Sequence, residues 1–130
     1  MHIERVASQA PYTARWGYSR AIRIGDRVLV SGTSATKPDG SVYAPGDAYE
    51  QTRYVLDLIQ AALRDVGASL EDVVSTRAYL TTRDIWPEVG RAHLEHFGAT
   101  LPTSTCIAGI ELLQPQLLVE IEAEAITAVD

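Results

Sequence analysis

The last thirty residues, LPTSTCIAGIELLQPQLLVEIEAEAITAVD (101–130), contain two apolar runs separated by a Gln-Pro-Gln break. Such a break is typical of a connection between two strands. In the second run, Val119 and Ile121 share one pleat face with Ala123 and Ala125, because strand side chains alternate. The other face carries Glu120, Glu122 and Glu124. A row of carboxylates is ordinarily a solvated face, and the pattern alone leaves that interpretation open.

A long amphipathic helix is predicted upstream, over residues 48–66. Apolar residues recur there at helical spacing from Val55 to Val66. Asp47 is a suitable N-cap and Gly67 a suitable end. A second helix is predicted over residues 86–97, because Pro87 is tolerated in a first helical turn.

The remaining segments predict strands. Residues 18–33 alternate and turn at Gly25-Asp26, which indicates a β-hairpin. VVSTRAYLTT (73–82) is rich in β-branched and aromatic residues, and HIERVAS (2–8) is a candidate edge strand. The order β-β-α-β-α-β-β predicts an α+β fold, with a single mostly antiparallel sheet and both helices on one face. We expect residues 1–130 to form one domain.

Composition excludes several function classes. The net charge is −6 and no basic cluster is present, which argues against nucleic acid or an anionic membrane as a partner. The one cysteine, Cys106, excludes an internal disulfide and a multi-cysteine metal site. No apolar run approaches a membrane span, and MHIERVASQ lacks a secretory core, so we expect a cytoplasmic protein. No Gly-rich phosphate loop is present, so no cofactor is implied.

One sheet face should stay uncovered if both helices pack on the other. A bare apolar sheet face would expose a large patch, which monomers rarely tolerate. We therefore expect self-association through this face.

Several motifs occur together in one order along the chain: GYSRAI (17–22), VSG (30–32), GASLEDVV (67–74), PTSTC (102–106) and VEIEA (119–123). In these motifs the chain resembles the RidA (YjgF/YER057c/UK114) family over nearly its whole length. The resemblance implies a chorismate-mutase-like fold and a homotrimer with a barrel-like centre. It also implies a small-molecule cleft at each subunit interface. Members of the family have been called endoribonucleases, an activity that the charge pattern here does not support.

The resemblance also implies roles for individual residues. In active members a glutamate of the VEIE strand holds the attacking water, which corresponds to Glu120. A tyrosine of the first hairpin, here Tyr18, and main-chain groups near the cysteine, here Cys106, shape the pocket. The family's substrate-binding arginine is replaced by Ser104. A hydroxyl cannot reproduce the two parallel bonds that a guanidinium gives a carboxylate, so we expect a substrate other than 2-aminoacrylate.

Arg20 is the candidate replacement for the missing arginine. It lies two residues after Tyr18 and so shares its strand face. The alternative is a surface arginine paired with a carboxylate. Ser31 and Gly32 end the second hairpin strand and are candidates for a close backbone approach to a ligand. The Cys106 thiol lacks a partner base, which favours a packing role over a nucleophilic one.

Other candidates have simpler explanations. His93 and His96 stand three residues apart on a predicted helix, but no third ligand completes a metal site, so packing is the favoured role. Trp16 and Trp86 either line a cleft or anchor a core or interface. Arg91 falls on an expected solvent face.

Two functions therefore remain at the sequence level. The first is hydrolytic deamination of an enamine or imine by a homotrimer, with Glu120 positioning water. The second is a non-catalytic trimer that binds a metabolite in the same interfacial cleft. A protein-interaction subunit is a third, more distant alternative.

Overall fold

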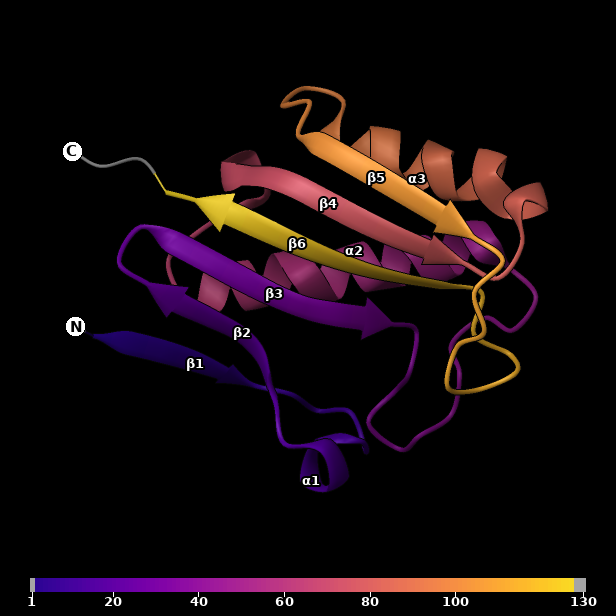
Figure 1. Cartoon of the computed structure of the whole chain (residues 1–130), viewed down its shortest axis with the longest axis horizontal. Coiled ribbons are helices and arrows are strands. Elements are labelled where there is room, and N and C mark those ends of the chain that lie inside the picture. Colours follow the sequence, from indigo (N-terminus) through magenta and orange to yellow (C-terminus); the bar gives the residue numbers. More distant parts are fainter. Residues whose placement is uncertain (1, 128–130) are drawn as a thin grey trace.

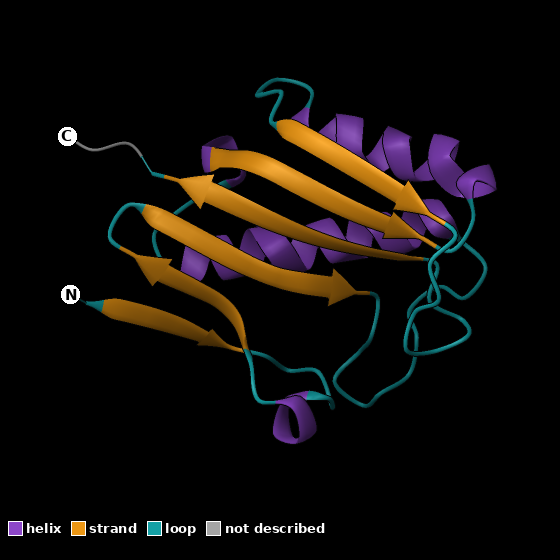
Figure 2. Cartoon of the chain, in the orientation of Figure 1, coloured by secondary structure: helices purple, strands orange, loops and turns teal. Residues whose placement is uncertain are grey.

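A computed structural model describes residues 2–127 of the chain as a six-stranded sheet with a layer of helices behind it (Figures 1 and 2). The strands are β1 (Ile3–Ala7), β2 (Ser19–Ile24), β3 (Arg27–Ser34), β4 (Val73–Leu80), β5 (Thr103–Ala108) and β6 (Val119–Ile126). The helices are α1 (Thr13–Trp16), α2 (Ala48–Asp65) and α3 (Trp86–Phe97), with 3₁₀ turns at Leu70–Asp72 and Arg83–Ile85. Within this part of the chain, no helix has the length and apolar composition needed to cross a bilayer.

The strand order is β1-β2-β3-β6-β4-β5. Every neighbouring pair is antiparallel except β4 and β5, which are parallel. The two C-terminal strands are therefore separated by β4, and β5 forms an edge of the sheet (Figure 1). The mostly antiparallel sheet predicted from the sequence is confirmed.

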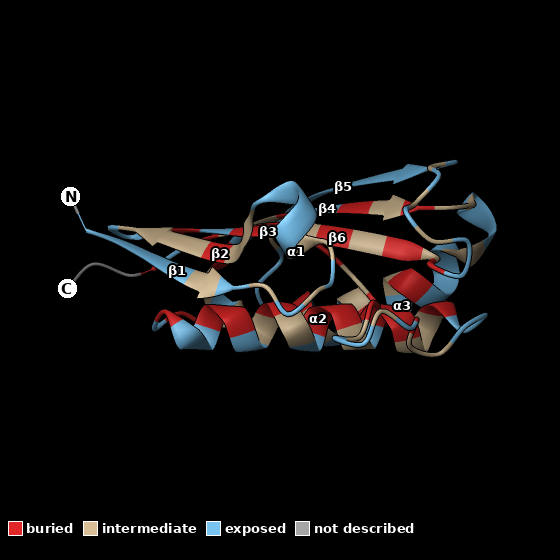
Figure 3. Cartoon of the chain, turned by 90° about the horizontal axis from the view of Figure 1, so that it is seen from below, coloured by how far each residue is buried: buried red, intermediate tan, exposed pale blue. Residues whose placement is uncertain are grey.

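Both long helices pack on one face of the sheet, as predicted (Figure 3). The core lies between these layers because α2 presents Val55, Leu56 and Ile59 toward the apolar face of β6. On β6 the buried and half-buried positions alternate, so its three glutamates lie on the face away from the helices. Asp47 caps α2 by accepting a hydrogen bond from the Glu50 N–H at 3.0 Å.

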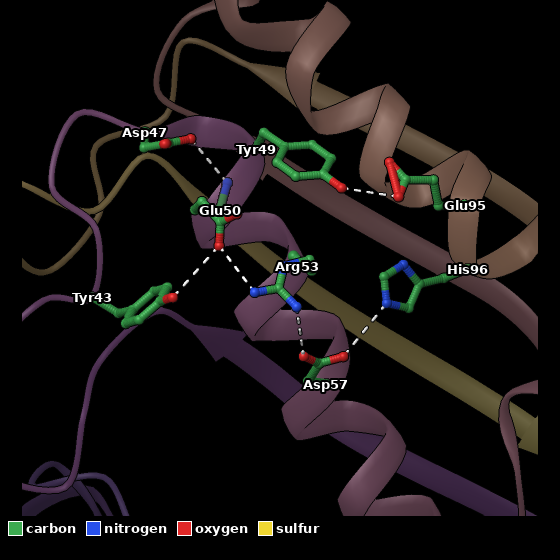
Figure 4. A network of polar contacts seen from close by, with 8 residues as sticks. All are labelled: Tyr43, Asp47, Tyr49, Glu50, Arg53, Asp57, Glu95 and His96. Carbon is green, nitrogen blue, oxygen red and sulfur yellow. Dashed lines mark hydrogen bonds and ion pairs between the residues drawn. The ribbon is translucent and has the colours of Figure 1, made fainter.

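The outer surface of the helical layer carries a polar network (Figure 4). Tyr49 of α2 donates a hydrogen bond to Glu95 of α3 at 2.9 Å, and His96 lies 3.6 Å from Asp57. Arg53 is placed between Glu50 and Asp57. At least one exposed partner, Arg53, Asp57 or Glu95, takes part in each of these contacts, so each one stabilises the fold little, and the apolar core holds the two helices together.

The opposite sheet face differs from the continuous apolar surface expected from the sequence. It is mixed: Arg27 pairs with Glu124, and the Tyr79 hydroxyl donates to Glu122. Exposed Leu29 lies beside these groups. All six residues of the β5 edge strand are exposed. An edge of this kind offers unpaired backbone groups to another chain.

One α-helix, α1, was not predicted. α1 is a single turn that begins after Pro11 and ends at Gly17, whose φ of 79° reverses the chain. The Thr13 hydroxyl donates a hydrogen bond to the Ala10 carbonyl at 2.9 Å, which ties the start of α1 to the segment before it. The turn lies beside the N-terminal end of the β2–β3 hairpin (Figure 1).

Candidate functional site

A hollow of about 770 Å³ opens between the α1 segment, the end of β3 and the loop before β6. Glu120 of β6 and Tyr79 of β4 line it from the sheet. Of the residues predicted to form the site, it contains Tyr18, Arg20, Ser31, Gly32 and Glu120. Segments far apart in the sequence therefore meet here, and the other lining residues are Ala10, Tyr12, Arg15, Trp16, Ser34, Thr36 and Ile110 to Leu113.

A β-bulge in β3 creates the close approach to Glu120. Val30 pairs with Ala123 and Thr33 with Ile121, so β3 has one residue more than β6 across this interval. A Cβ added at Gly32 would lie 2.9 Å from Glu120 Oε2. Glycine is required here because a side chain would displace the carboxylate. The bulge thus seats the Glu120 carboxylate against backbone.

Glu120 is half-buried in the hollow. Burial raises the pKa of its carboxyl above the usual value of 4.5, the Arg20 charge opposes this rise, and the Glu122 charge adds to it. The net result is a raised pKa, because desolvation outweighs the attraction to Arg20. A carboxyl with this property both accepts and returns a proton more readily near neutral pH than an exposed one.

Arg20 points toward the site but is held by the protein. Its Nη1 donates to the Gly32 carbonyl at 3.1 Å and to Thr33 Oγ1 at 2.8 Å, and its Nη2 donates to Ser8 Oγ at 3.1 Å. These contacts occupy three of the five guanidinium N–H donors. Arg20 therefore supplies positive charge near Glu120 and stabilises the bulge. Its guanidinium is not free to make two parallel hydrogen bonds to a substrate carboxylate.

Tyr18 is oriented by the same group of residues. Ser8 Oγ accepts hydrogen bonds from the Ala10 N–H and from Arg20, so its own hydrogen goes to the Tyr18 oxygen at 3.2 Å. The Tyr18 hydroxyl hydrogen is therefore available for another acceptor. The Arg20 guanidinium lies 5.7 Å from the centre of the Tyr18 ring.

Ser31 lines the hollow in a structural role. Its hydroxyl donates to the Ser19 carbonyl at 2.7 Å and ties β3 to β2.

Ser104 and Cys106 lie apart from the hollow in the same chain. Ser104 pairs in parallel with Thr76, and Cys106 with Ala78, so both share the helix-side face of the sheet. Glu120 is on the opposite face, because it pairs with Tyr79. Cys106 is exposed on the edge strand, contrary to the expected buried position, and burial of part of its side chain raises the pKa of its thiol. A raised pKa does not favour a nucleophilic thiolate.

The hydroxyl of Ser104 is part of a network that reaches α3. Thr76 Oγ1 donates to Ser104 Oγ at 2.8 Å and lies 2.9 Å from His93 Nε2. Burial lowers the pKa of His93, and the nearby His96 lowers it further, so His93 stays neutral at pH 7. A serine in the arginine position is thus held by hydrogen bonds within its own subunit.

The side chains of His93 and His96 point to different elements, which agrees with a packing role for both and not with a shared metal site. His93 faces β4 and β5, whereas His96 faces Asp57 of α2 (Figure 4). No cluster of three or more His, Cys, Asp or Glu side chains suited to a metal occurs within residues 2–127. Arg91 stacks on Tyr49, with its Cζ 3.9 Å from the ring centre, and neither residue lines the Glu120 hollow.

Sequence reasoning missed part of the site. Ser8 and Thr33 hold Arg20 by hydrogen bonds, yet neither belongs to a motif. The α1 wall was also missed. Tyr79 lies in the strand predicted over residues 73–82, but its pairing with Glu120 was not predicted.

Comparison with known proteins gives consistent results. The family model described as endoribonuclease L-PSP matches residues 7–127. The chain is 38% identical over 124 residues to a Streptomyces coelicolor protein, covering 95% of this chain and 91% of that protein. It is 32% identical over 108 residues to the 3-aminoacrylate deaminase RutC of Acinetobacter baylyi, with 83% and 85% covered. The crystal structure of a YjgF/YER057c/UK114 family member from Mycobacterium tuberculosis matches with a TM-score of 0.87 at 40% identity, covering 97% of this chain and 100% of that chain.

Proposed function

Because the chain belongs to the endoribonuclease L-PSP family, which is the YjgF/RidA family, we propose that it is a hydrolytic enamine or imine deaminase. The observation that carries the proposal is Glu120, a half-buried carboxyl of raised pKa seated against Gly32 in a hollow of metabolite size. Tyr18 and Arg20 line the same hollow. The reaction adds one water to the substrate and releases one ammonia.

The chemistry follows from the Glu120 carboxyl. In its protonated form the group gives its proton to the enamine carbon, which produces an iminium ion. The resulting carboxylate then takes a proton from a water that adds to the iminium carbon. Glu120 gives that proton to the nitrogen, which leaves as ammonia, while the hydroxyl proton of the carbinolamine passes back to Glu120, so that a carbonyl compound and the protonated carboxyl result. The Tyr18 hydroxyl hydrogen and the positive charge of Arg20 stabilise negative charge on the substrate.

The substrate need not be 2-aminoacrylate. Ser104 occupies the position of the family's substrate-binding arginine, and its hydroxyl bonds within its own subunit. The likeness to a 3-aminoacrylate deaminase makes 3-aminoacrylate the first compound to test. Its hydrolysis yields malonate semialdehyde and ammonia.

We propose that the acting form is a homotrimer with clefts between subunits. Ser104 and Cys106 cannot reach Glu120 of their own chain, because they lie on the other sheet face. The exposed β5 edge of a second copy would supply them. Sedimentation velocity of the purified protein tests the assembly, and a monomer at the enzyme's working concentration would contradict it.

Ammonia release tests the activity itself. The wild-type protein is given 3-aminoacrylate and 2-imino acids generated by an amino-acid oxidase, and ammonia is measured against the uncatalysed rate. We expect acceleration with at least one substrate. The competing function, a non-catalytic metabolite-binding trimer, predicts ligand-induced rises in Tm with every rate unchanged, and the serine in the arginine position favours it.

Gly32→Ala should separate activity from stability. Its added Cβ would lie 2.9 Å from Glu120 Oε2 and displace the carboxylate. Because a misplacement near 1 Å can cost about 10²-fold in rate, we expect kcat/KM to fall by at least about tenfold with little change in Tm. Gly90→Ala is the matched control, since its Cβ meets only the Trp86 ring at 4.0 Å. Unchanged kinetics in Gly32→Ala would contradict the placement of Glu120 in the reaction.

A further inference from the structure

We propose that the natural substrate is a carboxylic acid with a large apolar side chain, with its carboxylate on Arg15 and its apolar body against Trp16 and Leu113. The inference rests on the proposed function and specifies the substrate class of the same hollow. It assigns the lost arginine's task to a residue of α1 and not to Arg20.

The size of the hollow favours a large ligand. Pockets of about 300–1,000 Å³ ordinarily enclose drug-sized molecules, and this one measures about 770 Å³. A three-carbon acid would fill only a small part of this volume. A substrate with an aromatic or branched side chain would fill more of it.

Its outer wall is apolar and exposed. Trp16 is 83% exposed and Leu113 is 76% exposed, and both line the hollow. Large apolar side chains left in water beside a cavity mark a binding surface for apolar groups. Trp16 presents a wide face at low entropic cost, because its side chain has only two rotatable bonds.

Two cations line the hollow, and they differ in what holds them. Arg20 donates three hydrogen bonds to Ser8, Gly32 and Thr33. Arg15 is exposed on α1, and no acceptor among residues 2–127 binds its guanidinium. An unengaged guanidinium can make the bidentate contact that a carboxylate favours.

The wall that carries Arg15 and Trp16 is tied to the opposite wall. Gln114 Nε2 donates to the Tyr12 hydroxyl at 2.7 Å and to the Gly40 carbonyl at 3.2 Å. Tyr12 also lies 3.3 Å from Thr36 Oγ1. These bonds join the segment before α1 to the loop before β6, so the apolar end of the hollow is formed before a ligand arrives.

Binding of product-like acids is the direct test. Phenylpyruvate and pyruvate carry the same carboxylate, and only phenylpyruvate has a large apolar group. Titration calorimetry of the wild-type protein should show phenylpyruvate binding at least about tenfold more tightly, the difference expected from burying a ring. Arg15→Gln should weaken both acids by about ten- to a hundredfold. Trp16→Ala should weaken phenylpyruvate alone.

Matched variants control for nonspecific effects. Arg83→Gln and Trp86→Ala remove an exposed arginine and an exposed tryptophan that do not line the hollow, so both should bind as wild type does. Equal affinity for the two acids, or wild-type binding by Arg15→Gln and Trp16→Ala, would overturn the inference.

Turnover distinguishes this inference from the proposed function. If the binding pattern holds and no imine is hydrolysed, the ligand class stands and the deaminase proposal fails. If imines from alanine and phenylalanine are hydrolysed with equal kcat/KM, the deaminase proposal stands and the substrate class is wrong.

Discussion

Glu120→Gln is expected to lower kcat/KM for ammonia release by about 10²–10⁴-fold, the usual contribution of a general acid–base group. The amide can neither deliver a proton to the enamine carbon nor accept one from water. Glutamine is nearly isosteric with glutamate, so its side chain should still pack against Gly32 as the carboxylate does. Steady-state ammonia release at pH 7, with protein folding verified by circular dichroism, measures the loss.

The same variant should be more stable than wild type at pH 7. The pKa of Glu120 is higher in the folded protein than its usual 4.5, mainly because of burial. Above that raised pKa the carboxylate is charged in both states, and only the folded state carries the cost of desolvation. Gln removes this cost, so Tm should rise. As pH falls through the raised pKa toward 4.5, wild-type Glu120 becomes protonated and the difference in Tm should narrow.

The opposing signs make the test specific. A substitution that merely damages the fold lowers both activity and Tm, whereas Glu120→Gln should lower one and raise the other. Glu124→Gln is the control: Glu124 lies on the same face of β6 but pairs with Arg27 outside the hollow. It should retain full activity. Normal activity in Glu120→Gln would remove the carboxyl from the mechanism.

The same raised pKa shapes the pH dependence of the rate. The protonated form must give the first proton to the enamine carbon, so kcat/KM should fall as pH rises through the pKa of Glu120, which lies above 4.5. A decline centred at or below the usual glutamate pKa would contradict the desolvated site.

Elements with strong local patterns were predictable from the sequence. α2 was expected over residues 48–66 and spans Ala48–Asp65, because its buried stripe repeats at helical spacing and Asp47 caps it. The alternation in VEIEAEA predicted which β6 residues enter the core. Each of these patterns is complete within a few residues, so no distant contact is needed to interpret it.

The site was only partly predictable, because its geometry depends on register. The face of Ser104 follows from its pairing with Thr76, a residue 28 positions earlier, and no local pattern encodes that alignment. The prediction that Arg20 and Tyr18 share one strand face agrees with the position of the Arg20 guanidinium over the Tyr18 ring. The bonds of Arg20 to Ser8 and Thr33 depend on the β3 bulge and could not be foreseen.

Gln51→Leu is expected to produce the largest loss of stability. Gln51 is fully buried on α2, and its amide serves three backbone groups of two loops. Its Nε2 donates to the carbonyls of Gln116 at 2.9 Å and Ala44 at 3.3 Å, and its Oε1 accepts from the Leu118 N–H at 2.9 Å. Leu has similar volume but leaves these groups without partners. At about 1–3 kcal/mol for each group that stays out of water, we expect the free energy of unfolding to fall by about 2–4 kcal/mol in urea titration.

Gln116→Leu is the matched control for Gln51→Leu. It makes the same change on an exposed side chain and leaves the Gln116 carbonyl on Gln51 intact, so stability should change by less than about 0.5 kcal/mol. The Leu118 N–H that Gln51 accepts lies two residues before Glu120. A loosened loop in Gln51→Leu should therefore also lower activity at denaturant concentrations too low to unfold the protein. Equal unfolding midpoints for the two variants would show that solvent replaces the amide, and that the start of β6 is held by core packing around Val119 and Ile121 alone.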